Sequence, residues 1–431
     1  EDGSMTPYRL IELDISAMTL EAVKEFSLGK KEALRCKNMW TLGLVYWMYD
    51  RDRQVTIDWL NVKFTNLPDL AAANIAALNA GHAFGETAEI PDGVHGFSIG
   101  KADIAPGEYR TVTGAEALSW GLVAGAKLAG LKMTFCSYPI TPASSLLHTL
   151  CNLMDYDVVT FQAEDEIAAV CTAIGASYAG SLGITSSSGP GIALKAEAIG
   201  LAISAELPLI VVNSQRAGPS TGMPTKVEQN DIGTMISGDY PRVVLAPADQ
   251  GDCFEMSIFA TNLAQRIQGP VIAALDRALS QDSTTVKPFD LSGVELDTGK
   301  RLTPDEIAGL KEYRRYLITD DGVSPWAVPG TPGGENLVTG NERNEWGLVS
   351  AEPKNRKRMV EKRARKIESV RGDLPKGKRW GDADAAIGLL GFGTVGAVME
   401  RAAERLAKAG VEVQILQPRT LWPVLDETVE F

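Results

Sequence analysis

Short apolar runs alternate with alanine-rich segments between residues 111 and 285. Near-continuous apolar runs such as Pro208–Asn213 are typical of strands that are buried on both faces of a parallel sheet. The alanine-rich segments, such as 166–179, have the length and composition of helices. This repeated strand–helix alternation predicts a doubly wound parallel α/β domain over 111–285.

The same patterns give each element approximate bounds. Strands are expected at 133–137, 158–162, 183–186, 208–213, 242–246 and 269–275. Helices are expected between them at 113–130, 144–154, 166–179, 192–204 and 252–267.

Residues 1–82 predict a separate small domain. In order, we expect a strand at Arg9–Asp14, a helix at Thr19–Phe26 with Thr19 as its N-cap, a packed core helix at 38–49, a helix at 70–82 and a linker at 83–110.

After the central domain, 286–380 is an irregular connecting segment, and 381–431 begins a second, incomplete α/β unit. A basic run from Lys354 to Lys366 has the charge of a nucleic-acid patch. Met359 and Ile367 recur at helical spacing and acidic residues intervene, so the run predicts a solvated amphipathic helix.

Composition narrows the function classes. Lys and Arg number 42 against 55 Asp and Glu, and 42 − 55 gives a net charge of −13, which disfavours nucleic-acid binding. No apolar run reaches the roughly 18 residues of a membrane span, and Glu1–Met5 shows no signal-peptide apolar region. Five dispersed cysteines predict neither a zinc nor an iron–sulfur site and indicate a reducing, cytoplasmic setting.

Four polar stretches follow predicted strands of the central domain. They are Tyr138–Pro142, Gln162–Glu166, Thr185–Gly191 and Gln215–Thr225. Ligands of α/β domains bind at the carboxyl ends of strands, so these stretches predict one binding site.

Three residues of these stretches are candidates for chemistry. Glu166 directly precedes an apolar helix, so we expect it to be buried there with a raised pKa and to donate a proton near neutral pH. Two prolines fix the backbone around Thr141 and present its hydroxyl rigidly. Arg216, with Lys226 and the hydroxyls of the loop between them, suits a carboxylate or a phosphate. The alternatives are a plain acidic helix start, a stiff turn and a surface loop.

The turn Gly391–Gly396 follows a predicted strand and matches the G-x-G-x-x-G fingerprint of dinucleotide-binding folds. That fingerprint also requires an acid at the end of the next strand, where this chain has Gln414–Pro418. The pattern favours a structural turn, with an NAD-dependent dehydrogenase as the alternative.

The order of the motifs resembles the α subunits of the 2-oxoacid:ferredoxin oxidoreductases, from about residue 108 to 431. The shared motifs are Y-P-I-T-P at 138–142, E-D-E-I-A-A at 164–169, S-G-P-G at 188–191, Q-R-x-G-P-S-T-G-x-P-T at 215–225, Leu279-Ser280 and Gly340–Glu342. The form of the Q-R loop is most like the 2-oxoglutarate branch. Ser144–Leu146 and Ala217 depart from the family's pattern.

The resemblance implies three fold units. They are a pyrimidine-type thiamine-diphosphate-binding domain at 111–285, a transketolase C-terminal-like domain at 381–431, and the end of a γ-type domain, fused ahead of α, at 1–82. It also implies an enzyme that oxidatively decarboxylates 2-oxoglutarate with coenzyme A and ferredoxin.

The resemblance further implies a role for each site residue. Glu166, nine residues before Gly175, would meet a ring nitrogen of the aminopyrimidine, which Tyr138, Pro139 and Ile140 would line. Thr141 would lie beside the substrate and Arg216 would pair with its carboxylate. A distal carboxylate would be bound by Ser220, Thr221, Thr225 and Lys226.

A G-D-G motif, with which this family binds magnesium diphosphate, does not occur in the sequence, and Asp320-Asp-Gly322 is the nearest match. The resemblance therefore implies a β subunit that carries Mg²⁺ and [4Fe-4S] sites in an α2β2 assembly, with no metal on this chain. Pyruvate or a branched 2-oxoacid as substrate and a non-catalytic scaffold remain alternatives.

Overall fold

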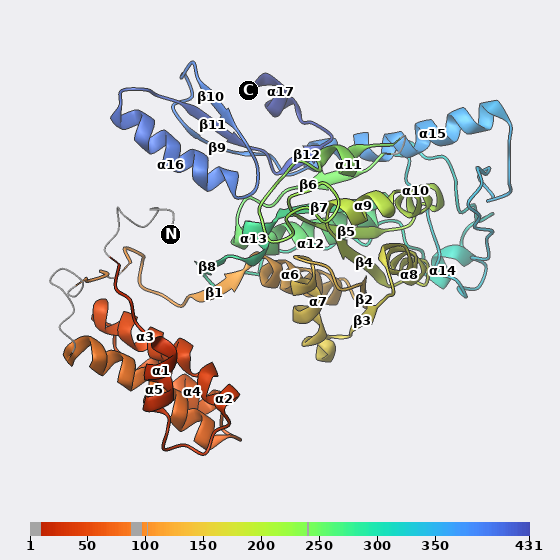
Figure 1. Ribbon diagram of the computed structural model, residues 1–431. Coiled ribbons are helices and arrows are strands. Elements are labelled where there is room, and N and C mark those ends of the chain that lie inside the picture. The colour runs from red at the N-terminus through yellow and green to blue at the C-terminus, as the bar shows by residue number, and fades with distance from the viewer. Residues whose placement is uncertain (1–9, 88–96, 101, 239–240) are drawn as a thin grey trace. The chain divides into compact units, whose positions relative to one another are not determined.

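The computed structural model divides the chain into two compact units, Glu1–Pro106 and Gly107–Phe431 (Figure 1). It describes residues 10–87, 97–100, 102–238 and 241–431. Each unit has an apolar core of its own, so each is treated separately.

The first unit is a bundle of helices in its described part. These helices are α1 (Ile15–Ala22), α2 (Lys30–Arg35), α3 (Lys37–Met48), α4 (Gln54–Lys63) and α5 (Pro68–Thr87). Helices α3 and α5 pack closely because each has a glycine at their crossing. A Cβ on Gly43 would lie 1.9 Å from the Leu78 carbonyl oxygen, and one on Gly81 would lie 1.8 Å from that of Trp40. The packed core helix predicted at 38–49 is confirmed.

The start of this unit differs from the prediction. The expected strand at Arg9–Asp14 is wrong for its described residues, and Arg9 lies outside them. Asp14 is the N-cap of α1 and accepts a main-chain N–H of the first turn at 2.9 Å. Thr19 is therefore not an N-cap, and its hydroxyl donates to the Ile15 carbonyl at 2.6 Å inside the helix. So short an alternating run cannot by itself distinguish a strand from a helix lead-in.

Helix α5 ends at Thr87, past the predicted start of the linker at 83. Residues 88–96 and 101 of that linker lie outside the described residues. Phe97 returns to the end of α3, where its ring centroid lies 5.6 Å from that of Tyr49. The described start of the linker, residues 83–87, is thus helical.

A seven-stranded sheet forms the centre of the second unit, in the order β12-β6-β7-β5-β4-β2-β3. Its strands are β2 (Met133–Ser137), β3 (Val158–Gln162), β4 (Leu182–Ser187), β5 (Leu209–Gln215), β6 (Val243–Leu245), β7 (Pro270–Asp276) and β12 (Thr420–Trp422). All neighbouring pairs are parallel except β12 and β6. Strand β5 is buried at every position, as its apolar run predicts. The doubly wound parallel sheet is confirmed.

Helices cover both faces of this sheet. The apolar core on one face of the sheet is formed with α6 (Gly114–Leu128), α7 (Ser144–Cys151) and α12 (Gln250–Ile267). The other contains α8 (Glu166–Tyr178), α9 (Gly189–Leu194) and α10 (Ala196–Ala205). Thr113 begins α6 through a capping box with Glu116. The single helix expected at 192–204 is broken at Lys195, which separates α9 from α10.

One buried ion cluster fixes the long segment that follows the sheet. Helix α15 (Pro353–Glu368) confirms the predicted helix at 354–366. Its basic residues are solvated only in part: Arg356, Lys357 and Arg358 are exposed. The fully buried Lys362 Nζ, in contrast, lies 2.5 and 2.7 Å from the two carboxylate oxygens of Glu206. Lys366 Nζ lies 2.7 Å from the same carboxylate, and Arg315 donates to the Glu206 carbonyl at 2.6 Å. The predicted solvation is wrong for Lys362 and Lys366, because their counter-ion comes from a distant part of the chain.

The remaining elements are short or lie towards the carboxyl terminus. They are β1 (Arg110–Thr113), η1 (Met154–Tyr156), α11 (Ile232–Ile236), α13 (Arg277–Gln281), β8 (Ser283–Val286), α14 (Pro304–Ala308), η2 (Arg371–Asp373), β9 (Lys378–Gly381), β10 (Gly388–Leu390), α16 (Val395–Lys408), β11 (Gln414–Gln417) and α17 (Asp426–Glu430). Strands β10, β11 and β9 form a three-stranded sheet, and β1 pairs with β8. Among the described residues, no helix combines the length and the apolarity needed to cross a bilayer.

Candidate active site

The polar stretches meet at one edge of the central sheet. Strands β3, β2, β4 and β5 are neighbours and parallel, so their carboxyl ends lie together. Tyr138 follows β2 and Arg216 follows β5 directly. The Tyr138 and Ser187 hydroxyl oxygens lie 2.8 Å apart, and Arg216 Nη1 donates to the Thr141 carbonyl at 2.6 Å. This edge is where the sequence predicts a ligand site.

Glu166 opens helix α8 at this edge. Asp165 is the N-cap of the helix and accepts the Ala168 N–H at 2.8 Å. The Glu166 side chain is only partly buried, and Ile167 beside it is 51% exposed. The expected burial of this acid is therefore wrong for the chain by itself, because the face that carries the first turn of α8 is open to solvent.

Tyr138 connects Glu166 to the end of β4. Burial raises the pKa of Tyr138; the hydrogen bond with Ser187 opposes that shift, and a hydrogen bond with the Glu166 side chain adds to it. The net result is a pKa well above its ordinary value, so Tyr138 is a neutral hydroxyl across the physiological range. Tyr138 thus forms a hydrogen bond with the Glu166 carboxyl group and carries no charge of its own.

Lys195 is a buried residue of this site that the sequence analysis missed. Its Nζ donates to the Thr185 hydroxyl at 2.8 Å and to the Glu166 main-chain carbonyl at 3.0 Å. It also lies 5.4 Å from the ring centroid of Tyr138. Burial lowers the pKa of Lys195 to about 8, although Glu166 partly offsets this effect. The available signal was a lysine in the segment 192–204, whose other residues are small or apolar except for Glu197.

Arg216 is 8% exposed, and its buried Nε has no hydrogen-bond acceptor within the described part of the chain. Ser188 Oγ and the amide oxygens Asn213 Oδ1 and Gln215 Oε1 are also buried without a hydrogen-bond partner there. Buried polar atoms normally have partners, so this set fits a polar ligand or ordered water. The structure brings Arg216 and Thr141 together, but through the Thr141 carbonyl rather than through the predicted hydroxyl.

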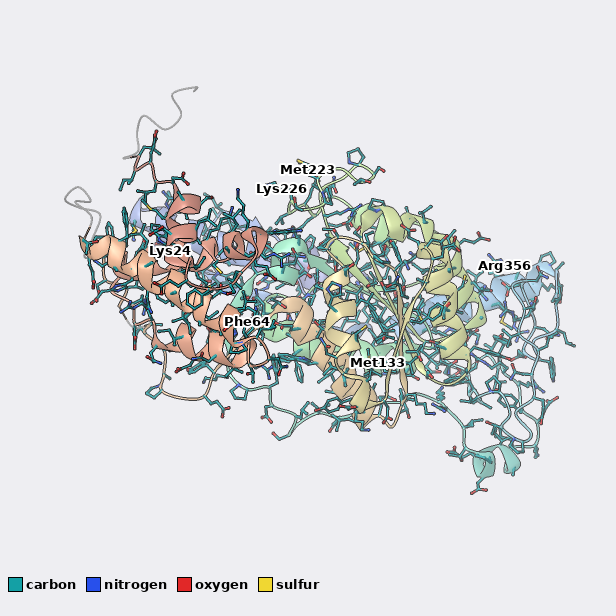
Figure 2. All side chains as sticks on the ribbon, turned by 60° about the horizontal axis from the view of Figure 1, so that its bottom comes forward. Lys24, Phe64, Met133, Met223, Lys226 and Arg356 are labelled. Carbon is teal, nitrogen blue, oxygen red and sulfur yellow. The ribbon has the colours of Figure 1, made fainter. Side chains whose placement is uncertain are left out.

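The loop 217–227 carries the residues predicted for a distal carboxylate. Ser220, Thr221, Thr225 and Lys226 are all exposed. Figure 2 shows Lys226 and Met223 close together on this projecting loop. The Met223 N–H donates to the Ala217 carbonyl at 3.0 Å and closes the loop on itself. These residues therefore lie on the surface, in contrast to the buried Arg216. Of the predicted cofactor-lining residues, Tyr138 is buried, Ile140 is partly buried and Pro139 is exposed.

The base of this loop is fixed to the sheet. The Asp231 carboxylate accepts hydrogen bonds from Asn213 Nδ2 at 2.8 Å and Gln215 Nε2 at 2.5 Å, both on β5. The Glu228 carboxylate accepts the Gly218 N–H at 3.0 Å. These contacts hold both ends of the loop beside Arg216 although its tip is exposed.

The turn Gly391–Gly396 is filled by a carboxylate of the same chain. Asp276, at the end of β7, accepts the main-chain N–H of Thr394 at 2.8 Å and its hydroxyl at 2.9 Å. Gln229 Nε2 donates to Asp276 at 3.1 Å and to the Phe392 carbonyl at 3.1 Å. A carboxylate at the start of α16 thus takes the place that a pyrophosphate has in dinucleotide-binding folds. The geometry supports the structural turn rather than the NAD site.

We expect titration with this chain to leave the fluorescence of NADH unchanged, because Asp276 already accepts the donors at the start of α16. Asp276→Ala is the second variant to titrate, because it removes the carboxylate that accepts these donors and leaves the main chain of the turn in place. Saturable enhancement of NADH fluorescence by the unaltered chain would contradict the assignment as a structural turn.

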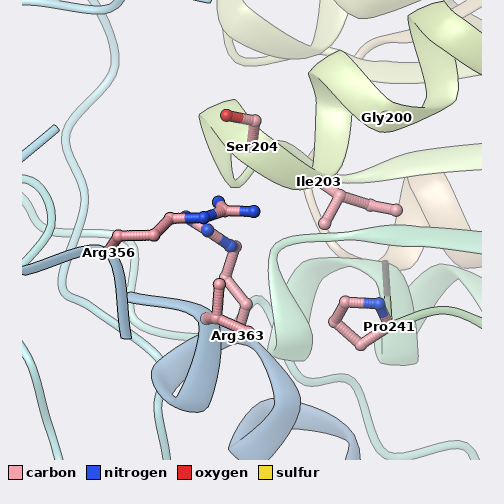
Figure 3. Close-up of a pocket in the computed structure, with 7 residues that line it drawn as sticks. Gly200, Ile203, Ser204, Pro241, Arg356 and Arg363 are labelled. Carbon is pink, nitrogen blue, oxygen red and sulfur yellow. The ribbon is translucent and has the colours of Figure 1, made fainter. Parts of the chain in front are cut away.

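A separate cavity of about 190 Å³ lies between α10 and α15 (Figure 3). Ser204, Arg356 and Arg363 are among its lining residues. Both arginines donate to the Glu342 carboxylate, at distances of 2.6 to 3.1 Å. Both arginines are thus paired within the chain, and the cavity contains none of the predicted site residues.

Comparison with known proteins supports the motif assignment. The family model "Pyruvate flavodoxin/ferredoxin oxidoreductase, thiamine diP-bdg" matches residues 124–362. The chain is 39% identical over 429 residues to 2-oxoglutarate oxidoreductase subunit KorA of Mycobacterium tuberculosis, covering 98% of this chain and 64% of the relative. It is 32% identical to subunit alpha of 2-oxoacid:ferredoxin oxidoreductase 1 of Aeropyrum pernix, covering 96% of this chain and 65% of the relative.

A solved structure agrees with these relatives. The 2-oxoglutarate:ferredoxin oxidoreductase from Magnetococcus marinus, with 2-oxoglutarate, coenzyme A and succinyl-CoA bound, superimposes with a TM-score of 0.80 at 33% identity. The match covers 94% of this chain and 69% of that chain. The chain thus spans a little under two thirds of the length of the two curated relatives. The resemblance drawn from the motifs is confirmed, and the chain belongs to the pyruvate flavodoxin/ferredoxin oxidoreductase family, alongside the α subunits of 2-oxoacid:ferredoxin oxidoreductases.

Proposed function

We propose that this chain is the α subunit of a thiamine-diphosphate-dependent enzyme that oxidatively decarboxylates 2-oxoglutarate to succinyl-CoA and CO₂ and transfers electrons to ferredoxin. The observation that carries the proposal is the buried Arg216, which has an unused Nε at the same sheet edge as Glu166. The names of the relatives agree with this chemistry: two archaeal relatives, at 30% identity, are 2-oxoglutarate synthase subunits KorA.

The residues at the sheet edge fit the pyrimidine half of thiamine diphosphate. Glu166 offers a carboxyl group that is held by Tyr138 and still partly open, so it can meet a ring nitrogen brought from outside the chain. Pro139 and Ile140 lie directly after Tyr138 and would line the ring. When bound, thiamine diphosphate supplies the nucleophilic carbon that attacks the 2-oxo group. Glu166 holds and moves the proton at the ring nitrogen.

Arg216 is assigned to the carboxylate next to the 2-oxo group. Its guanidinium is oriented by the Thr141 carbonyl, which accepts from Nη1 at 2.6 Å. This contact leaves Nε and the other terminal nitrogen for a planar carboxylate, the geometry that arginine binds best. The Thr141 side chain is exposed beside this position and would contact the substrate.

The rest of the assembly is proposed to come from a partner. Relatives that match most of this chain are named as α subunits, and we assign Mg²⁺ with the diphosphate and the [4Fe-4S] cluster to a β subunit in an α2β2 enzyme. Coenzyme A and ferredoxin are the remaining reactants, and we place the enzyme in the cytoplasm. This arrangement makes the active site shared between two chains.

The test is co-expression of the chain with its partner and assay with a panel of 2-oxoacids. The panel contains 2-oxoglutarate, pyruvate and a branched 2-oxoacid, each with coenzyme A and a low-potential dye as acceptor. We expect the highest kcat/KM for 2-oxoglutarate. A higher value for pyruvate or for the branched acid would overturn the substrate assignment but leave the chemistry intact, whereas no reduction with any acid would overturn the function.

Lys226→Ala tests the binding of the distal carboxylate of 2-oxoglutarate separately from that of the carboxylate next to the 2-oxo group. We expect KM for 2-oxoglutarate to rise by about 10-fold or more, the equivalent of a lost hydrogen bond between charged groups, while KM for pyruvate stays the same. Steady-state kinetics with both acids measures the difference. Lys127→Ala is the matched control, because Lys127 is an exposed lysine whose partner is Asp157 at 2.7 Å. Equal changes in KM for the two acids would contradict the assignment of Lys226.

A further inference from the structure

Lys195 is a fully buried cation that the proposed chemistry does not use. It lies between α9 and α10, and both of its side-chain acceptors are uncharged: the Thr185 hydroxyl and the Glu166 carbonyl. An ammonium group that is buried without a carboxylate partner is unfavourable for stability. The fold therefore retains Lys195 at this position for a reason other than stability.

The contacts of Lys195 converge on the first turn of α8. The bond of 3.0 Å to the Glu166 carbonyl ties this turn to β4, because Thr185 on that strand accepts from the same Nζ at 2.8 Å. The surroundings are tight: a Cβ on Gly191 would lie 2.5 Å from Tyr138 Oη and 3.0 Å from Glu166 Cγ. The packing around Gly191 therefore restricts the Glu166 side chain on that side. Lys195 holds the main chain of the same residue through its carbonyl.

We propose that Lys195 is a positioning residue for Glu166, which it holds by the main chain of the first turn of α8 while placing a positive charge beside its carboxyl group. This inference rests on the proposed function, in which Glu166 exchanges a proton with the cofactor ring. In that function the cofactor ring contacts Glu166, and Lys195 acts on the ring only through Glu166.

The charge of Lys195 lies close to ionisable groups of two neighbouring elements. The titratable groups that act on Lys195 are, in decreasing order, Glu166, Cys136, Asp165 and Cys171, which come from β2 and α8. A nearby positive charge favours an ionised carboxylate.

The test is Lys195→Met, which keeps the length of the side chain and removes its charge and its donors. In the co-expressed enzyme we expect kcat to fall on the order of 10²-fold, as for other displaced catalytic groups, with KM for 2-oxoglutarate within about 3-fold. The midpoint of thermal unfolding should stay equal or rise. Lys366→Met is the matched control: Lys366 is also buried but pairs with Glu206, so the midpoint should fall while kcat is retained.

Hydrogen exchange in the isolated chain gives a readout that needs neither cofactor nor substrate. In Lys195→Met the amides of the first turn of α8, residues 167–170, should exchange faster than in the unaltered chain, whereas Lys366→Met should leave them unchanged. Unchanged exchange at 167–170 would overturn the positioning role, whether or not the enzyme is active. A lower unfolding midpoint with full kcat would overturn it as well. If the unaltered enzyme reduced no acceptor with any 2-oxoacid, the proposed function would fail, and the exchange result would still decide whether Lys195 holds α8.

Discussion

Replacing Glu166 by glutamine is expected to lower the 2-oxoacid-dependent reduction of a low-potential acceptor by about 10²–10⁴-fold, the range that a positioned proton-transfer group contributes. Glutamine keeps the size of the side chain and can still donate a hydrogen bond, but it cannot exchange a proton with the cofactor ring. Steady-state assay of the co-expressed enzyme with 2-oxoglutarate and coenzyme A measures the loss, which should appear in kcat because Glu166 is not assigned to substrate binding.

Glu164→Gln is the control for this experiment. Glu164 lies on the same short connection between β3 and α8, and its side chain is exposed. Removing its charge changes the net charge equally but leaves the proposed proton-transfer group in place, so activity should be retained. If Glu166→Gln kept full activity, the acid would have no chemical role, and the interpretation of this chain as a non-catalytic scaffold would gain support.

The second large effect is expected from Glu206→Gln, which should lower the free energy of unfolding of the second unit by about 3–5 kcal/mol, as when one partner of a buried ion pair is removed. Burial raises the pKa of Glu206, but Lys362, Lys366 and Arg315 outweigh burial and hold that pKa far below its ordinary value. The carboxylate is therefore charged in the folded protein. Without it, two lysines and an arginine would remain buried without a counter-ion.

Urea-induced unfolding monitored by tryptophan fluorescence measures this change. In the unaltered chain the free energy of unfolding should also rise between pH 7 and pH 10, and the sign follows from Lys366. Burial lowers the pKa of Lys366 to about 7, so above that pH the folded state binds fewer protons than the unfolded state, and stability rises with pH. Glu312→Gln is the matched control, because Glu312 pairs with Arg314 at the surface, and the unfolding midpoint should not move. An unchanged midpoint in Glu206→Gln would contradict a stabilising role for the cluster.

Local patterns were sufficient to predict the central sheet. Strand β5 is apolar along most of its length because both of its faces are covered, and such runs stand out against the alanine-rich helices. The edge that carries the site could also be predicted, since parallel strands bring the residues that follow them to one side. Tyr138 and Arg216 lie there for this reason.

Contacts between distant residues could not be predicted. Lys362 and Glu206 are 156 residues apart in the sequence, and a lysine on a periodic helix is ordinarily solvated. Lys195 was missed for the same reason, because its acceptors on β4 and α8 become neighbours only in the folded chain. The burial of Glu166 was overestimated because an apolar sequence after an acid does not reveal which face of the helix will be covered.

The side-chain amide of Gln229 links two regions that the sequence keeps 163 residues apart. Through one nitrogen it contacts both Asp276 and the Phe392 carbonyl, and it stands two positions before Asp231, which anchors the loop carrying Lys226. A rotation of β10, the turn after it and α16 would therefore displace the residues that anchor that loop. Under the proposed role of Lys226, the position of the carboxyl-terminal segment would then influence how this loop binds a distal carboxylate.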